Sequence, residues 1–96
     1  LSYALNDYTR AIQLSPKSWE IYFSRGKVYF EKGKYNEAIT DFSLALKYDP
    51  SKGEVYFYRG ACKDALKDTE GACADLKKAA ALHYQQAETQ LEKYCQ

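Results

Sequence analysis

The stretch Trp19–Lys52 reads W-E-I-Y-F-S-R-G-K-V-Y-F-E-K-G-K-Y-N-E-A-I-T-D-F-S-L-A-L-K-Y-D-P-S-K, and the rest of the chain consists of shifted copies of it. Pro50 corresponds to Pro16 upstream and Gly26 corresponds to Gly60 downstream, at one and the same offset. Three further positions recur at this offset, as Ala4, Tyr8 and Ala11, then Ala38, Phe42 and Ala45, then Ala72, Leu76 and Ala79. This spacing is typical of a helix-turn-helix unit that is repeated along a stacked array.

The order of these residues resembles the tetratricopeptide repeat: an aromatic opening followed by Gly26, Tyr29, Ala38, Phe42, Ala45 and Pro50. The resemblance covers about the whole chain. It implies an all-α fold in which antiparallel helix pairs stack into a right-handed α-solenoid. It also implies a scaffold that binds a peptide or protein segment in its concave groove. The C-terminal sequence, from G-A-C-A-D-L-K-K-A-A to E-K-Y-C, also looks like the ending of certain bacterial proteins of this family, several of which are exported.

The bulk composition restricts the class of partner. A chain of 96 residues is long enough for one domain with a single continuous core. The net charge of +1 leaves no basic surplus to neutralise phosphates, which argues against a nucleic-acid partner. No apolar run has the length of a membrane span, and the sequence shows no signal peptide. The compartment stays open between the cytoplasm and export.

We interpret residues 1–96 as one domain of repeated units. Residues 1–18 would be the second helix of a truncated repeat, residues 19–52 and 53–86 two full repeats, and residues 87–96 a C-terminal capping helix. Because the sequence begins in the middle of a repeat, we expect it to be a piece of something longer.

Apolar periodicity and turn signals predict six helices. Their expected bounds are 1–14, 19–31, 35–48, 54–66, 69–82 and 85–96. Gly33 should supply the left-handed residue that ends the second helix, and Gly26 and Ala38 should lie where the helices of one repeat cross most closely. The first helix has no preceding partner, so its apolar face should be uncovered. This face suggests an alternative function, self-assembly with another chain or with upstream repeats, through Leu1, Leu5, Tyr8 and Ile12.

No motif in the sequence supports catalysis. It has no G-x-S-x-G, no H-E-x-x-H and no phosphate-binding glycine loop, so we expect neither an enzyme nor a cofactor site. The single histidine, His83, is expected at a helix end, where a partial positive charge suits the helix dipole. Three cysteines without a C-x-x-C pair, with one histidine, are too few suitably spaced ligands for a structural zinc site.

The cysteines allow three interpretations. Cys62, Cys73 and Cys95 fall on helical faces and are most simply small apolar fillers. A disulfide between Cys73 and Cys95 is the alternative, because the last helix must pack on the helix that carries Cys73 or on its neighbour. Such a bond requires an oxidising compartment. A thiol-redox function would instead require a cysteine of low pKa.

Charged residues also recur at the repeat spacing, as Asp7, Asp41 and Asp75 and as Arg25 and Arg59. The arginines stand where the tetratricopeptide family often has leucine. We expect their stems to be packed and their guanidinium groups to face carboxylates, so that neighbouring helices interlock. Contact with a ligand is the alternative.

The resemblance implies that the first helix of each repeat lines the groove. Aligning the three copies of this helix gives an acidic row, Glu20, Glu54 and Glu88, beside an apolar row, Phe23, Phe57 and Leu91. Neighbouring positions complete the predicted groove residues, namely Lys27, Phe30, Tyr58, Ala61 and Asp64. The helix dipole explains the three glutamates by itself. It does not explain Phe23 and Phe57, which would be exposed aromatics unless something covers them.

One function known in the family, binding of the carboxylate tail of a chaperone, requires particular residues in the groove. Repeats that clamp the carboxylate tail of a chaperone place Lys, Asn and Arg on the groove rows. The matching positions hold Glu20, Phe23, Ser24, Lys27, Glu54, Phe57 and Tyr58. Only Lys27 is cationic, so the sequence disfavours an acidic tail and favours a segment with large apolar side chains and a nearby Lys or Arg.

Overall fold

The computed structural model of the protein describes the backbone of residues 2–95 and the side chains of residues 4–93 and of Cys95. Six helices occupy this part of the chain, close to the predicted bounds, and it contains no strand. They are α1 (Ser2–Leu14), α2 (Trp19–Glu31), α3 (Tyr35–Tyr48), α4 (Gly53–Ala65), α5 (Thr69–Ala81) and α6 (Gln85–Tyr94). The predicted contributions of Leu1 and of the Tyr94 side chain lie outside the described residues.

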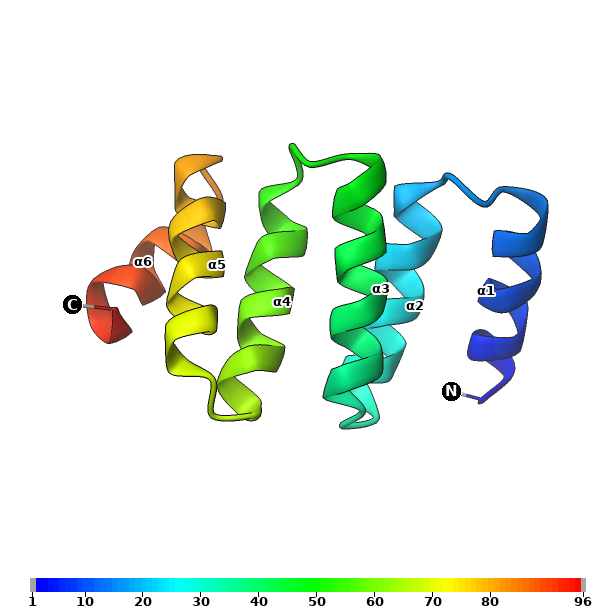
Figure 1. Cartoon of the computed structure of the whole chain (residues 1–96), viewed down its shortest axis with the longest axis horizontal. Helices are drawn as coiled ribbons and strands as arrows, with labels where there is room; N and C mark the ends of the chain where they lie inside the picture. The colour runs from blue at the N-terminus through cyan, green and yellow to red at the C-terminus, as the bar shows by residue number, and fades with distance from the viewer. Residues whose placement is uncertain (1, 96) are drawn as a thin grey trace.

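The helices stack in chain order, and successive helices run in opposite directions (Figure 1). Helix α2 packs on α3 and α4 packs on α5, and the two pairs join where α3 meets α4. Helix α1 packs on α2 at one end of the stack, and α6 packs on α5 at the other. The result is an elongated all-α solenoid with extents of 41 × 25 × 17 Å. None of the helices that the structure describes has both the length and the apolar character needed to cross a membrane.

The core is largest where α2, α3 and α4 meet. Phe42 of α3 and Val55 of α4 are completely buried there. Gly26 and Ala38 are also buried, as expected of residues at a helix crossing. A smaller cluster, built around Leu76, joins α5 to α6. The core therefore continues along the stack and becomes thinner toward the C-terminal end.

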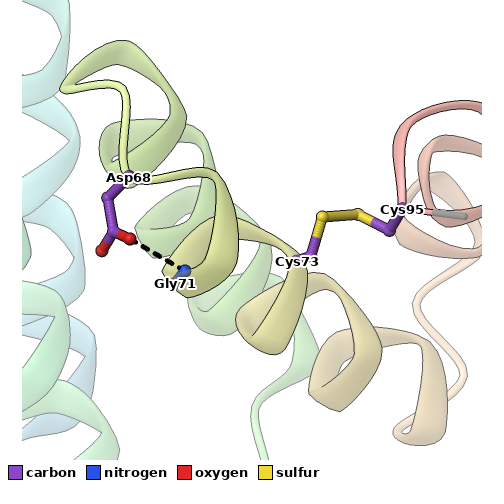
Figure 2. Close-up of a disulfide and its surroundings, with 4 residues drawn as sticks. All are labelled: Asp68, Gly71, Cys73 and Cys95. Carbon is purple, nitrogen blue, oxygen red and sulfur yellow. Dashed lines mark hydrogen bonds between the residues drawn. A yellow bond between two sulfur atoms is a disulfide. The ribbon is translucent and has the colours of Figure 1, made fainter.

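Three helix ends depend on residues in the left-handed region. Gly33 ends α2 with φ of 76°, which confirms its predicted role. Lys67 and His83, which follow α4 and α5, both have φ of 66°, an uncommon conformation for residues with a β-carbon. His83 thus lies at a helix end as predicted, and its backbone conformation is what ends the helix. Helix α5 begins with a side-chain N-cap, since the Gly71 amide donates to Asp68 Oδ1 at 3.0 Å (Figure 2).

The two recurring arginines interlock the helices, which confirms the favoured interpretation. Arg25 of α2 donates from Nε and Nη2 to the Asp41 carboxylate of α3, both at 2.7 Å. Arg59 of α4 donates in the same way to Asp75 of α5, at 2.9 and 2.8 Å. Each arginine also reaches back to a hydroxyl of the preceding helix, Arg25 to Thr9 and Arg59 to Ser43. One side chain thus ties together three successive helices of the stack.

Helix α1 is the least embedded helix. None of its described side chains is buried, and Leu14 at its end is 81% exposed. The predicted uncovered face needs one correction: Ile12 packs against the buried core cluster that contains Phe42. Leu5 and Tyr8 remain half-buried. The apolar stripe of α1 is therefore partly used inside the molecule.

Candidate functional site

The predicted groove residues all lie on α2, α4 and α6, which are alternate helices of the stack, and α2 and α4 also contact each other. Four of them are exposed carboxylates, namely Glu20, Glu54, Asp64 and Glu88. Six are half-buried, namely Lys27, Phe30, Phe57, Tyr58, Ala61 and Leu91. The remaining residue, Phe23, is buried. The exposed members of the predicted set are therefore all acidic, and its half-buried members are apolar or aromatic except for Lys27.

The expectation that Phe23 is an exposed aromatic is wrong, because its side chain is only 5% exposed. Its ring lies 5.7 Å from that of Tyr58 and 5.8 Å from that of Phe42, measured between centroids. The Lys27 ammonium lies 4.5 Å from the centroid of the Phe23 ring. Phe23 is thus covered by a residue of the next repeat, and it belongs to the core.

Tyr58 of α4 packs its ring against aromatic residues of α2 and α3, and so joins the second full repeat to the first. Its ring packs edge-on against Phe30, with centroids 5.9 Å apart, and lies 6.1 Å from the ring of Phe42. Phe57, its neighbour in the sequence, packs 5.7 Å away in a T-shaped arrangement. Aromatic pairs at such distances add stability beyond the area they bury. Part of the apolar row that the sequence analysis assigns to ligand binding therefore forms the contact between the two repeats.

Phe57 is the aromatic residue of the apolar row that keeps exposed surface. It packs on Tyr84, with centroids 5.1 Å apart, and on the small cluster around Leu76. Burial and the nearby Glu54 carboxylate raise the pKa of Tyr84, because both disfavour a phenolate. The hydroxyl of Tyr84 stays protonated at neutral pH and donates to Gln86 Oε1 at 2.9 Å. Phe57 and Tyr84 thus form a half-exposed aromatic pair beside an exposed carboxylate.

A cavity of about 450 Å³ lies between α4, α5 and α6. Two predicted groove residues of α4, Ala61 and Asp64, are part of its lining. The other lining residues were not predicted, and they are Gly60, Thr69, Ala72, Cys73, Leu76, Gln90 and Cys95. The sequence signal that could have identified them is the replacement of several large side chains of one repeat by smaller ones at the same positions of the next.

The side wall of this cavity contains a disulfide between Cys73 of α5 and Cys95, directly after α6 (Figure 2). The two Cα atoms are 5.6 Å apart, within the range of disulfide geometry. The alternative interpretation is thus correct for this pair. Cys62 is a buried filler, as first expected, and burial raises the pKa of its thiol to about 12. That thiol lacks the low pKa a redox function requires.

The fold and the sequence period together define a class, the stacked helix-turn-helix repeat proteins. The family model described as "TPR repeat" matches residues 1–33 and 26–62, and the one described as "Tetratricopeptide repeat" matches residues 54–83. These matches cover most of the chain, so the protein belongs to the tetratricopeptide repeat family.

Two curated relatives share part of the sequence. The TPR repeat-containing thioredoxin TDX of Arabidopsis thaliana is 35% identical over 81 residues, which are 84% of this chain and 21% of that protein. Tetratricopeptide repeat protein 14 of Mus musculus is 41% identical over 44 residues, which are 46% of this chain and 6% of that protein. The chain thus spans about a fifth or less of the length of either relative.

Solved structures share the arrangement of the helices. The first TPR of Spaghetti (RPAP3), bound to the HSP90 peptide SRMEEVD, superposes with a TM-score of 0.88 and 27% identity, over 95% of this chain and 74% of that one. The second TPR domain of human RPAP3, in complex with the HSP70 peptide SGPTIEEVD, gives a TM-score of 0.87 and 26% identity, over 96% and 78%. PcrH, in complex with the chaperone binding region of PopD, superposes with a TM-score of 0.89 and 20% identity, over 95% of this chain and 75% of that one. At this identity the similarity supports the fold alone.

Proposed function

We propose that this chain is a protein–protein interaction scaffold that binds a peptide or protein segment across α2, α4 and α6, without catalysing a reaction. The observation that carries this proposal is the pairing of half-exposed aromatics with exposed carboxylates on these helices, above all Phe57 beside Glu54. A few well-packed residues, often aromatic, carry most of the binding energy of an interface, and flanking charges help to select the partner.

The charges of this surface favour a basic partner. The structural neighbours from RPAP3 were solved with SRMEEVD and SGPTIEEVD, peptides that both end in two glutamates, a valine and an aspartate. At the predicted groove positions of this chain, Glu20, Glu54, Asp64 and Glu88 face solvent, whereas the one cation, Lys27, lies over the Phe23 ring. An acidic tail would be repelled here, so we infer a segment with large apolar side chains and nearby Lys or Arg.

The test is a panel of peptides with equal length and identical apolar positions, whose flanking residues are Lys and Arg, Ser, or Asp and Glu. Fluorescence anisotropy with the 96-residue protein should rank the basic peptides first and the acidic ones last. Backbone amide shifts should then map the bound basic peptide onto α2, α4 and α6. Preference for acidic peptides, or shifts confined to α3 and α5, would contradict the proposal.

Self-assembly through α1 is a second candidate, because none of the described side chains of this helix is buried and Leu14 is largely exposed. Light scattering of this chain beside a version extended upstream by a repeat tests it. If the present chain dimerises and the extended one stays monomeric, the face of α1 stacks on another copy. If both are monomeric, this second function is excluded.

A further inference from the structure

The cavity between α4, α5 and α6 has a filled counterpart one repeat earlier, between α2, α3 and α4. Its lining residues Asp64 and Leu76 occupy the repeat positions that Phe30 and Phe42 hold in the preceding unit. The helices that surround the two places also correspond, since α2, α3 and α4 are followed at the same spacing by α4, α5 and α6. We call the place between α2, α3 and α4 the first junction, and the place between α4, α5 and α6 the second junction. The residues that fill the first junction therefore indicate what the cavity at the second junction can hold.

At the first junction this place is filled by the ring of Tyr58. The ring lies 5.9 Å from Phe30 and 6.1 Å from Phe42, measured between centroids. Phe30 packs in turn on Tyr35, with centroids 5.8 Å apart. These rings close the space between the three helices, and Phe42 at the base is completely buried.

At the second junction the corresponding rings are missing. The positions of Phe30, Tyr35 and Tyr58 are occupied by Asp64, Thr69 and Glu92. All three replacements are exposed, and the position of Phe42 holds the smaller Leu76. The cavity is the space that this exchange leaves in an otherwise repeated arrangement.

We propose that the cavity receives one tyrosine side chain of the bound segment, in the place that Tyr58 occupies at the first junction. This inference rests on the proposed interaction function and specifies one anchor of the partner. Ala72 and Leu76 provide a buried apolar base for a ring. The Asp64 carboxylate, exposed and part of the lining, can accept a hydrogen bond from the phenolic hydroxyl. The volume of about 450 Å³ falls in the range of pockets that bind whole small molecules, so it has room for a tyrosine ring.

The disulfide gives this cavity a fixed wall. Cys73 and Cys95 both line it, and their bond ties α5 to the end of α6 (Figure 2). A wall that is held covalently does not have to be ordered when the ligand enters, which reduces the entropic cost of binding. The same bond keeps α6 from moving away to leave a flat surface.

The first test uses p-cresol, which reproduces the tyrosine side chain, titrated into the 96-residue protein and followed by backbone amide shifts. Shifts should concentrate at lining residues such as Gly60, Ala72 and Gln90. The same titration with n-butylammonium, the counterpart of a lysine side chain, asks whether the Asp64 carboxylate selects a cation instead. The proposal is overturned if p-cresol shifts no lining residue, or if n-butylammonium binds there more tightly.

The second test supplies the missing ring from within the chain. Glu92→Tyr places a tyrosine at the position of Tyr58, so it should raise the Tm and weaken p-cresol binding about tenfold or more. Lys93→Tyr adds the same ring to the next residue of α6, which is also exposed, and should leave p-cresol binding unchanged. Unchanged p-cresol binding by a folded Glu92→Tyr variant would contradict the assignment. If that variant does not fold, Asp64→Phe fills the cavity from α4 and is judged by the same criterion.

The peptide experiments separate this inference from the interaction function. A basic peptide that binds α2, α4 and α6 should lose affinity about tenfold or more when its tyrosine is replaced by alanine. Equal binding of the alanine peptide would overturn the cavity assignment and leave the interaction function supported. Failure of every peptide to bind would overturn both.

Discussion

The ring of Phe42 lies directly against the backbone of Gly26, where α2 and α3 cross. A β-carbon added to Gly26 would come within 2.6 Å of Phe42 Cε1. At the equivalent glycine of the next repeat, Gly60, the residue in place of Phe42 is Leu76, whose Cγ would be 3.8 Å from an added β-carbon. The nearest atoms to that β-carbon, Ala72 O and Asp75 Cβ, would be at 3.2 Å. The repeat therefore places a glycine at both crossings, but the first crossing leaves much less room.

Gly26→Ala should destabilise the protein by on the order of 1–3 kcal/mol, because the buried Phe42 ring has no space to move away. Gly60→Ala should lie within about 1 kcal/mol of the parent, since alanine favours a helix over glycine by a similar amount and offsets the closer contact. Urea unfolding of both variants measures the difference. Equal stabilities would mean that Phe42 does not hold α2 at this distance.

Asp41→Ala should cost on the order of 1–3 kcal/mol, because it leaves the half-buried Arg25 guanidinium without its carboxylate. The double variant Arg25→Leu with Asp41→Leu should lose less stability, since it removes both charges and restores the leucine common in this family at position 25. Chemical denaturation of the single and double variants distinguishes the two. A double variant less stable than Asp41→Ala would show that the pair stabilises the fold in its own right.

Reduction of the Cys73–Cys95 bond should lower the free energy of unfolding by about 3 kcal/mol, the loop-closure estimate for a separation of 22 residues. The protein with Cys73→Ala and Cys95→Ala should match the reduced parent. This variant should also be insensitive to reductant, because the remaining Cys62 is buried and its pKa is raised to about 12. Unfolding with and without reductant provides the measurement, and no response of the parent would exclude the bond in solution.

Helix α1 should exchange its amide hydrogens fastest among the six helices, because it packs mainly on α2 and none of its described side chains is buried. Native-state hydrogen exchange, run beside a determination of oligomeric state, checks this. Protection of α1 equal to that of α3 in a proven monomer would contradict the prediction.

Much of the fold could be predicted from the sequence because the repeat signals are local. A helix crossing requires small residues, and Gly26 and Ala38 recur in the next repeat as Gly60 and Ala72. A left-handed helix end requires a residue such as Gly33. Each signal lies within a few residues of the structural feature it produces, so the position of that feature can be predicted without knowing how the helices pack.

The candidate site was less predictable, because its accessibility depends on contacts between repeats. Phe23 has the same pattern position as Phe57, yet it is covered by Tyr58, which belongs to the following repeat. The partnership of Cys73 and Cys95 likewise required the relative placement of two helices. The repeat alignment shows which residues share a row, whereas only the packed structure shows which of them remain exposed.

Half-exposed Phe57 and the exposed carboxylate of Glu54 beside it provide the sharpest test of the interaction function. Phe57→Ala should weaken binding of the basic peptide by about 1–3 kcal/mol, as expected for a central aromatic anchor. Because this ring also packs on Tyr84 and the cluster around Leu76, the variant should lose some stability as well. Leu46→Ala is the matched control, since Leu46 is a buried residue of α3 and lies on none of the three binding helices.

Glu54→Lys should act differently from Phe57→Ala, because an exposed charge mainly affects the encounter of the two partners. We expect slower association with a basic peptide, a smaller dependence of the rate on salt and little change in dissociation. Stopped-flow mixing at several ionic strengths measures the rates, and calorimetry gives the affinities of both variants and of Leu46→Ala. If Leu46→Ala weakens binding as much as Phe57→Ala, lost stability explains the effect and Phe57 is no anchor. If Phe57→Ala and Glu54→Lys both bind like the parent, the partner contacts the opposite side of the stack, formed by α3 and α5.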